Sequence, residues 1–489
     1  MMRLVWLVMV VLVSPALSAA VPSSHLEWAR KNQGRFAYGI YFQEKKVGWV
    51  VEEMKVKTEQ GKEVLVSTSH TYMATLFDGE KSIKEEKSST TYDLTGEGVI
   101  LSGESVRKDD GKEVVRRVER DGDRLKISTL QGGRTLVRHI PFPKDTVANQ
   151  RDLETWLTGK RQRDDTFTKF SSAWEEQDVN SKQIYRYKGK KRILHRGELT
   201  DLFQVEINLD GGKLESDVFS DSRAYRGSMG GLLTMKLEPE KLAKALDGPP
   251  VDLLPVTSVK IAEDLGPSRQ LIELTMRLQG LGDFEIPASH RQQIRTDPKG
   301  VVVTLRRDFV VEKPVKLSDD QIKEYLSATP RIQSDQDQVR ELARKIVGKT
   351  TDPMEKGKKI EAWVFRKLRK SYSDNADTAL EILDHMAGDC TEHSLLFVSL
   401  ARAVGLPCRE VGGLAFISGP NPSFGWHAWA EFHDGRQWVS VDPTWNQVFV
   451  DASHLKMSSG EKDLAWTNVI GTLKMDVLES RKRGKDSEK

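Results

Sequence analysis

The 489-residue chain has only two cysteines, no long hydrophobic run beyond its N-terminus and almost no excess of either charge. No later run reaches eighteen apolar residues, so we expect the mature chain to be soluble, without a transmembrane helix. A formal net charge of +3, from 75 basic and 72 acidic residues, gives no general case for nucleic-acid binding. A hydrophobic content of 38% predicts a globular protein, and the length allows about three domains.

The first twenty residues have the pattern of a secretory signal. Arg3 precedes the apolar run 4–13, and small residues follow from Ala16 to Ala20. Ten apolar residues are too few to span a bilayer, so we expect cleavage near Ala19 or Ala20. An uncleaved signal anchor is the alternative. The predicted compartment is a bacterial periplasm or the cell exterior.

Residues 24–245 are predicted to form a β-rich N-terminal domain. Alternating segments end at turn pairs such as Asp110-Gly111, and a short helix is expected over 152–160. The expected strands include 36–42, 47–56, 63–73 and 93–105. Successive hairpins of this kind favour one large antiparallel sheet. The domain is interpreted as a scaffold or substrate-presenting module, and a concave sheet that binds an apolar ligand is the alternative.

A Pro- and Gly-rich break over 237–255 separates this region from the rest. Strands expected over 269–279 and 300–311 predict a small β domain at 250–315. The helical periodicity that follows predicts a third domain at 316–470. Residues 471–489 are predicted to form a charged tail. The order of helices, a further helix and then strands predicts an α+β fold for the third domain.

Cys390 begins a predicted helix in this third domain. Apolar residues recur at helical spacing from Leu396 to Val404, and Gly405 ends the pattern. A thiol at a helix N-terminus lies beside free backbone N–H groups and the positive end of the helix dipole, so we expect a lowered thiol pKa. The N–H of Cys390 is one candidate oxyanion donor, and the sequence does not identify a second.

A hairpin after the helix supplies a candidate base and its carboxylate partner. Asp434-Gly435 predicts a two-residue turn, in which His433 pairs with Arg436 and His427 with Asp442. Their Cα atoms would lie about 5.5 Å apart in a hydrogen-bonded pair. Cys390, His427 and Asp442 are therefore predicted to be the nucleophile, the base and the residue that orients the base.

Other readings of the cysteines and histidines were weighed against this triad. A helix of about fourteen residues spans roughly 21 Å, whereas a disulfide needs Cα atoms within about 7 Å, so Cys408 is predicted to be a buried apolar residue instead. His393, one turn after Cys390, is the rival base, and His433 is expected to be solvated. A metal site formed by Cys390, His393 and His427 lacks zinc-like spacing.

Several sequence blocks of the third domain resemble the bacterial transglutaminase-like family, over roughly residues 335–460. The blocks are Gly388-Asp389-Cys390, 400–407 (LARAVGLP), 412–414 (GGL), 427–431 (HAWAE) and 438–444 (WVSVDPT). The resemblance implies a papain-like core in which Cys390, His427 and Asp442 are the catalytic triad. Cys408 departs from the small residue usual before Arg409, and this departure leaves the triad untouched.

The sequence thus predicts an exported enzyme that attacks amide bonds through a thioester on Cys390. The family includes crosslinking transglutaminases, peptidases, amidases and inactive members, so the resemblance leaves the acyl acceptor and the substrate open. A protein or peptide substrate is expected, with no cofactor, no metal and no nucleic acid. The alternative function is a non-catalytic binding or scaffold protein built on the same core.

Overall fold

The computed structural model describes residues 24–483 except 132, 175–177, 247, 374–375 and 461–464, and the predicted signal peptide lies outside these residues. The chain forms two compact units. The first comprises the chain up to Leu76 together with Lys81–Val251, and the second comprises Phe77–Glu80 together with the chain from Asp252 onward. Among the described helices, none is long and apolar enough to cross a membrane.

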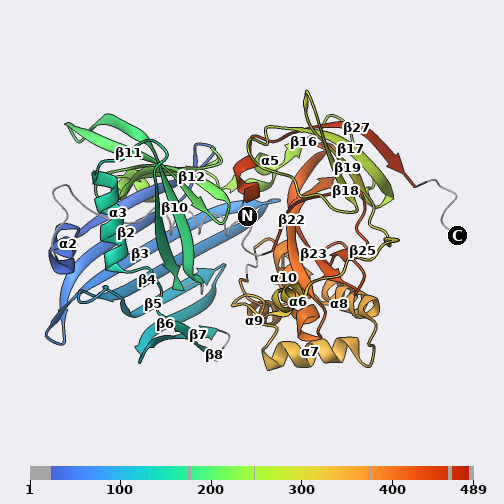
Figure 1. The fold of residues 1–489 in the computed structure, drawn as a ribbon, viewed down its shortest axis with the longest axis horizontal. Helices are drawn as coiled ribbons and strands as arrows, with labels where there is room; N and C mark the ends of the chain where they lie inside the picture. Colours follow the sequence, from blue (N-terminus) through green and yellow to red (C-terminus); the bar gives the residue numbers. More distant parts are fainter. Residues whose placement is uncertain are drawn as a thin grey trace. The chain divides into compact units, whose positions relative to one another are not determined.

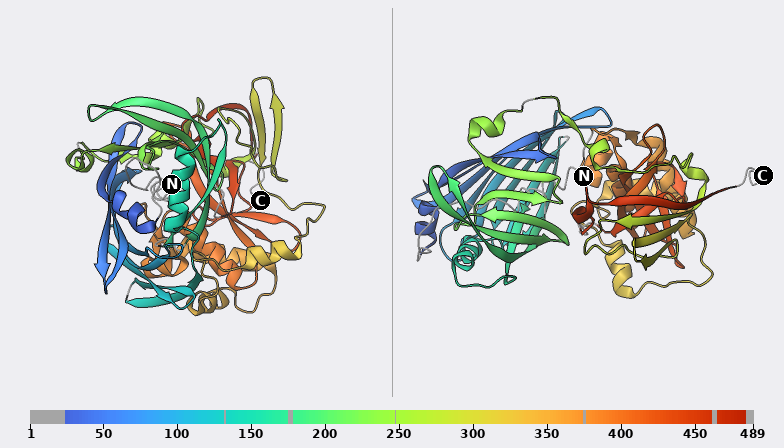
Figure 2. Two further views of the ribbon diagram at one scale, coloured as in Figure 1. Left: turned by 60° about the vertical axis from the view of Figure 1, so that its left-hand side comes forward. Right: turned by 90° about the horizontal axis from the view of Figure 1, so that it is seen from above.

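The first unit is built on one large, curved antiparallel sheet (Figure 1). Its strands follow the order β8-β7-β6-β5-β4-β3-β2-β1-β14-β13-β12-β11-β10-β9. Figure 2 shows the sheet curving so that helix α3 lies against its inner face. The strands are β1 Gly34–Phe42, β2 Lys45–Glu59, β3 Lys62–Phe77, β4 Glu80–Asp93, β5 Ile100–Asp109, β6 Lys112–Asp121, β7 Arg124–Gln131, β8 Arg134–Pro141, β9 Thr166–Ala173, β10 Asp178–His195, β11 Glu198–Leu209, β12 Gly212–Val218, β13 Ala224–Met229 and β14 Leu233–Glu238, and the helices are α2 His25–Lys31, α3 Val147–Thr158 and α4 Glu240–Lys244.

Local sequence explains most of these hairpins. In β6, Val114, Arg116 and Val118 are buried and alternate with more exposed residues, which is the period of a strand with one buried face. Asp110 and Gly111 both have positive φ angles, as the favoured two-residue turn requires. The predicted large antiparallel sheet is confirmed.

Two element boundaries differ from the sequence prediction. The segment 93–105 is two strands, because Gly96 and Gly98 take positive φ angles and the Asp93 side chain accepts a hydrogen bond from the Thr95 N–H at 2.9 Å. The helix expected over 152–160 begins earlier, at Val147, where the Thr146 hydroxyl accepts from the Asn149 N–H.

The second unit combines helices with two main sheets, so the α+β fold class is confirmed. The larger sheet has the order β25-β24-β23-β22-β26, with β16 beside β23, and the other has the order β18-β19-β17-β27. The elements from residue 251 onward are β15 Val251–Asp252, α5 Leu253–Thr257, β16 Val259–Lys260, η2 Ser268–Gln270, β17 Leu271–Gln279, β18 Gln292–Asp297, β19 Gly300–Arg306, α6 Asp319–Leu326, α7 Asp337–Val347, α8 Pro353–Lys367, β20 Arg369–Lys370, α9 Ala379–His385, β21 Ala387–Gly388, α10 Cys390–Ala403, β22 Cys408–Ile417, β23 Ser423–His433, β24 Trp438–Asp442, β25 Gln447–Val448, β26 His454–Ser459, η3 Ala465–Val469 and β27 Lys474–Lys482.

The predicted domain limits at 250–315 and 471–489 do not coincide with these elements. Strands β17 and β19 share a hydrophobic core with β22, β23 and β26, so the proposed small β domain is part of the second compact unit. Part of the predicted tail is strand β27, which pairs with β17 and buries Met475 in that core. The charged residues of β27 are exposed.

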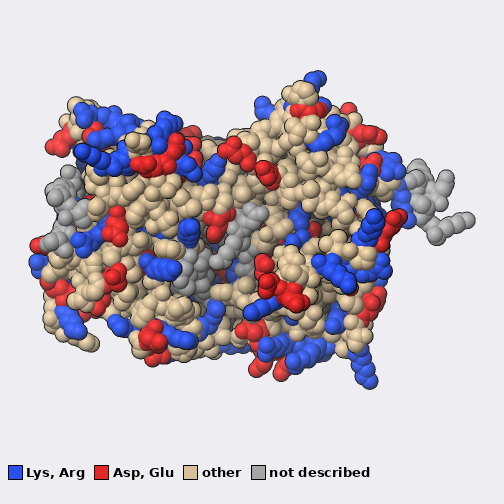
Figure 3. Space-filling view, viewed as in Figure 1, with Lys and Arg blue, Asp and Glu red and all other residues tan. Residues whose placement is uncertain are grey.

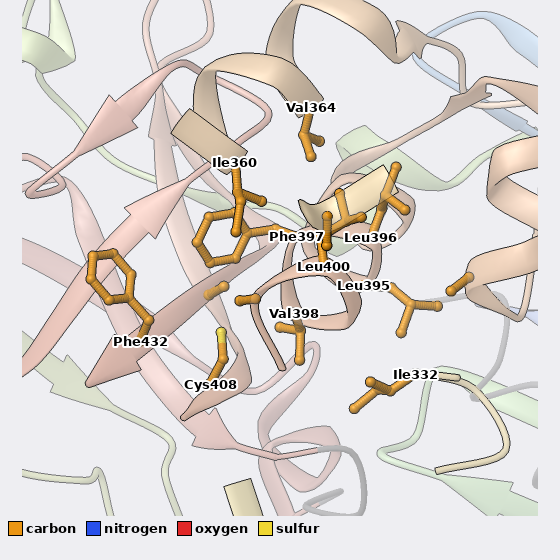
Figure 4. Close-up of a cluster of buried hydrophobic side chains, with 14 of the residues drawn as sticks. Ile332, Ile360, Val364, Leu395, Leu396, Phe397, Val398, Leu400, Cys408 and Phe432 are labelled. Atoms are coloured by element: carbon orange, nitrogen blue, oxygen red, sulfur yellow. The ribbon is translucent and has the colours of Figure 1, made fainter. Parts of the chain in front are cut away.

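Two hydrophobic cores lie at opposite ends of β22 and β23. Phe416 and Phe424 belong to the core between the sheets, and Cys408 and Phe432 belong to the core formed with helices α7, α8 and α10. Figure 4 shows Cys408 among apolar side chains of the helical core, including Phe397. The stretch of β22 and β23 between the two cores contains Gly413 and its partner His427.

Cys408 gives a test of this packing. Cys408→Ser should lower the free energy of unfolding by about 1–3 kcal/mol, because a buried hydroxyl would replace an apolar thiol that is 0% exposed. Cys408→Ala should cost less, since it leaves a small cavity but no unpaired polar group. Urea unfolding of both variants measures the difference. A serine variant as stable as the wild type would contradict the apolar environment.

Candidate active site

Cys390 is the first residue of helix α10, as the sequence predicts. The Asp389 carboxylate accepts a hydrogen bond from the Thr391 N–H, and Glu392 accepts one from the Asp389 N–H, both at 2.7 Å. This reciprocal pair is a capping box, which fixes the point where the helix begins. Gly388 is required beside it, because an added Cβ would lie 2.3 Å from the Cβ of Glu392.

His427 lies in the middle of β23 opposite Gly413. A Cβ at Gly413 would lie 2.1 Å from the backbone oxygen of Leu455, so only glycine allows the close approach of β26 here. The imidazole of His427 stacks on Trp445 with ring centroids 4.3 Å apart, and only 7% of its side chain is exposed. The ring is therefore held in one orientation.

The predicted two-residue hairpin register is wrong. His433 pairs with Trp438, and Ala430 pairs with Val441, so the loop contains four residues rather than two. The Asp434 carboxylate accepts hydrogen bonds from the N–H groups of both Arg436 and Gln437 at 2.8 Å. Asp434 is a turn residue, as predicted, but its side chain stabilises a longer turn than the Asp-Gly pair alone suggests.

His427 and Asp442 nevertheless meet, as diagonal neighbours rather than a directly opposed pair. Nε2 of His427 lies 2.9 Å from Oδ2 of Asp442. The other carboxylate oxygen accepts from the N–H groups of Thr444 and Trp445, at 2.8 and 3.2 Å. Burial opposes ionisation of Asp442, but the imidazoles of His427 and His454 hold its pKa well below its usual range.

His454 is a second imidazole on the same carboxylate, and the sequence did not suggest it. Its Nε2 lies 3.2 Å from Oδ2 of Asp442, and its Nδ1 lies 3.2 Å from Oδ1 of Asp451. Burial lowers the pKa of His454, but the two carboxylates outweigh burial and raise it. Because an ionised carboxylate only accepts hydrogen bonds, His454 donates from both nitrogens and carries a positive charge.

The thiol of Cys390 lies next to β23. The pairing of β23 with β24 ends at Ala430 and Val441, and beyond it the N–H of Ala428 approaches the thiol and lowers its pKa. Burial and then the charge of Asp389 have the larger effect, and the pKa of Cys390 is raised well above its ordinary value. The predicted lowering of this thiol pKa is therefore wrong, and the raised pKa favours the neutral thiol over the thiolate.

Tyr372 is a further neighbour of Cys390 that the sequence did not suggest. Burial is the main cause that raises the pKa of Tyr372 to about 12, and a thiolate on Cys390, when it forms, acts in the same direction. Its phenol is therefore a neutral hydrogen-bond donor near the reactive sulfur at physiological pH.

The other predicted candidates have structural partners. Nδ1 of His393 lies 2.7 Å from the backbone oxygen of Asp389, and burial lowers the pKa of His393. His433 is buried rather than solvated, and its Nε2 donates to the Val315 backbone oxygen at 2.8 Å. Cys390 and Cys408 are both free thiols, in agreement with the rejection of a disulfide.

One group of possible metal ligands is present among the described residues. The donor atoms of His427, Asp442 and His454 all lie within 4.8 Å of one another. Both Nε2 atoms are at hydrogen-bond distance from the same carboxylate oxygen, which is the geometry of two N–H donors sharing one acceptor. The set differs from the Cys390, His393 and His427 combination considered from sequence.

The neutral state of Cys390 is directly testable. The rate of alkylation by iodoacetamide should rise continuously from mildly acidic to alkaline pH, because only the thiolate reacts and the raised pKa keeps it scarce. Cys390→Ala should abolish labelling of the native protein, since Cys408 is buried. A rate that is already maximal at mildly acidic pH would show a thiolate–imidazolium pair instead.

Comparison with known proteins gives a family match over the part of the chain that contains these residues. The family model of the transglutaminase-like superfamily matches residues 340–443. An uncharacterized protein of Haemophilus influenzae is 32% identical over 171 residues, which are 30% of this chain and 46% of that protein, so the match spans less than half of its length.

Two solved structures share weaker similarity. A proposed cysteine protease from Cytophaga hutchinsonii is 20% identical, with a TM-score of 0.28, and the match covers 44% of this chain and 86% of that one. A proposed protease from Parabacteroides distasonis is 12% identical, with a TM-score of 0.20, over 78% of this chain and 70% of that one. The stretch of the chain that matches the transglutaminase-like superfamily, residues 340–443, includes Cys390, His427 and Asp442.

Proposed function

We propose that the protein is an exported cysteine enzyme that transfers the acyl group of an amide through a thioester on Cys390. The observation that carries the proposal is the 2.9 Å contact between His427 and Asp442, together with the approach of the Ala428 N–H, next to His427 in β23, to the thiol of Cys390 at the start of α10. Export to the periplasm or the cell exterior is proposed from the signal sequence, and a protein or peptide substrate from the family.

The orientation of His427 suits the role of general base. Ionised Asp442 accepts the Nε2–H of His427, which leaves Nδ1 with a lone pair. Because the resting thiol is neutral, the proton of Cys390 passes to Nδ1 as the sulfur attacks the carbonyl carbon. The positive charge that develops on His427 is stabilised by Asp442.

The acyl transfer then follows in two balanced steps. The C–N bond breaks, and His427 returns its proton to the leaving amine, which yields the thioester on Cys390. Water or a second amine then attacks the thioester carbon, and His427 accepts the proton of the attacking group. The C–S bond breaks, the acid or the new amide leaves, and His427 returns the proton to the sulfur, which restores the thiol. The backbone N–H of Cys390, which has no partner within its own helix, is the proposed oxyanion donor.

The charge distribution supports a peptide rather than a nucleic acid as the substrate. On the face shown in Figure 3, basic and acidic side chains are interspersed, without a continuous basic stripe. The whole chain carries a formal net charge of only +3. A nucleic-acid channel normally gathers Lys and Arg on one surface.

A non-catalytic scaffold is the alternative function. Such a protein would have no need of a charged carboxylate buried beneath an ordered histidine, because burial of an ion is costly unless its partners compensate. The described chain compensates Asp442 with four hydrogen bonds. That arrangement favours the enzyme.

Substitutions of the nucleophile and its distal carboxylate separate the two functions. Cys390→Ala should abolish thioester formation, and Asp442→Asn should lower kcat by roughly 10² to 10⁴, because the amide would present N–H groups to two imidazole N–H donors. Turnover on a panel of peptide amides, with and without a primary amine, measures both effects, and thermal melts check folding. If the wild type is inactive on the panel and Cys390→Ala retains the cellular role, the scaffold function is correct.

His454 should set the pH dependence of the same reaction. His454→Gln keeps a donor for Asp442 but removes the positive charge, so Asp442 acts on His427 with its full negative charge. We expect the acid limb of the kcat/KM profile to move to higher pH. His433→Gln is the matched control, because His433 is also buried but bonds the Val315 backbone instead. A uniform loss of activity without a shifted limb would indicate a purely structural role.

A further inference from the structure

A partly open cavity of about 80 Å³ lies within the first unit. Its sheet side is formed by neighbouring residues on one face of β1, β2 and β3, where Phe36 pairs with Glu52 and Met54 pairs with Ser67. Helices α2 and α3 contribute Trp28 and Val147 to the opposite side. The cavity is therefore formed by elements of a single compact unit.

The carboxyl group of Glu52 has no partner in this cavity. Glu52 is 9% exposed, and within the described chain it makes no hydrogen bond and no ion pair. The two other acidic residues that line the cavity already have partners. Glu53 lies 2.7 Å from the ammonium of Lys55, and Asp145 accepts a hydrogen bond from the Gln150 side chain at 3.0 Å. Burial alone holds the pKa of Glu52 well above its usual range.

A buried carboxyl without a partner is costly, and protein interiors normally satisfy such groups. Its retention beside an open volume suggests that the partner comes from a ligand. A site of this kind, mainly apolar with one directed polar group, is typical of pockets for small molecules.

The other residues that line the cavity indicate the charge of that ligand. No Lys or Arg side chain lines the cavity within the described residues. The helix α3 begins there, but its first N–H groups are already used: Val147 donates to Gly98, Ala148 to Glu97 and Asn149 to the Thr146 hydroxyl. The usual donors for an anion are therefore absent or occupied.

Aromatic faces add the features of a cation site. Trp28 and Tyr92 line the cavity, and the indole N–H of Trp28 is held by Glu154 at 2.6 Å, so its ring is fixed. Phe36 also lines the cavity, but the guanidinium of Arg223 lies over its ring at 4.4 Å, which leaves Trp28 and Tyr92 as the candidate aromatic faces. Aromatic rings attract organic cations through the negative charge of their faces, most strongly where water is excluded. Met54 and Leu65 provide apolar surface for the rest of the molecule.

We infer that this cavity binds an organic ammonium ion, with its charged nitrogen beside Glu52 and its apolar body between the aromatic side chains. Binding converts Glu52 from the neutral acid to the carboxylate, so a proton is released as the ion pair forms. The inference is independent of the proposed acyl transfer, because the cavity and Cys390 belong to different units.

Three probes of one shape test the inference on the full-length protein. Phenethylammonium should bind, the neutral 2-phenylethanol should bind at least about tenfold more weakly, and phenylacetate should not bind. Calorimetry in two buffers of different ionisation enthalpy should give about one proton released for each phenethylammonium bound.

Glu52→Gln should lower the affinity for phenethylammonium at least about tenfold and remove the proton release, since an amide cannot ionise. The fold should survive, because the glutamine replaces a carboxyl that is neutral in the empty protein, and a thermal melt checks this. Glu86→Gln is the matched control: Glu86 is also buried in the sheet but bonds Ser105 at 2.6 Å and lies outside the cavity lining.

Several outcomes would overturn the inference. These are tighter binding of phenylacetate, equal binding of the alcohol and the ammonium ion, unchanged affinity in Glu52→Gln, or no binding of any probe. Equal binding of alcohol and ammonium would identify an apolar pocket in which Glu52 stays protonated. Loss of acyl transfer in Cys390→Ala has no bearing on these results, so the two proposals fail separately.

Discussion

The carboxylate of Asp442 is the group on which the geometry of the second unit's site depends. It lies at the point where β24 separates from β23, and its two oxygens accept from two imidazoles and two backbone N–H groups. The backbone donors fix the carboxylate, and the carboxylate in turn fixes His427. His454 lies between the carboxylates of Asp442 and Asp451 and is within hydrogen-bond distance of both. Each buried charge therefore has a neighbour of opposite sign, whereas burial of a single charge would be costly.

Patterns over short stretches of sequence were sufficient to predict much of the fold and the position of Cys390. Helical spacing and the glycine after it located α10, and its first residue is Cys390 as expected. The alternation of the N-terminal region predicted its antiparallel sheet. Cys408 was placed in the core by the length of the helix between the two thiols. Each of these predictions depends on residues close together in the chain.

The errors came from contacts that a local pattern does not contain. The Asp-Gly pair suggested the shortest hairpin, but side-chain bonds from Asp434 to two backbone N–H groups select a longer loop. The expected lowering of the Cys390 pKa depended on the helix N-terminus and on an imidazolium at His427, whereas burial and Asp389 raise the pKa. His454 lies in the site because β26 pairs with β22, a strand far from it in sequence. Strand β27 forms at the edge of its sheet because it pairs with β17.

The burial of Cys408 has a chemical consequence under the proposed export of the protein to an oxidising compartment. Cys390 has no second thiol within reach, so a sulfenic acid formed on it could not be converted to an internal disulfide. Its repair would depend on a thiol supplied by another molecule, and without one the oxidation would proceed irreversibly. A neutral resting thiol reacts slowly with oxidants, because oxidation requires thiolate character. The environment that delays ionisation of Cys390 therefore also protects it during the intervals when no substrate is bound.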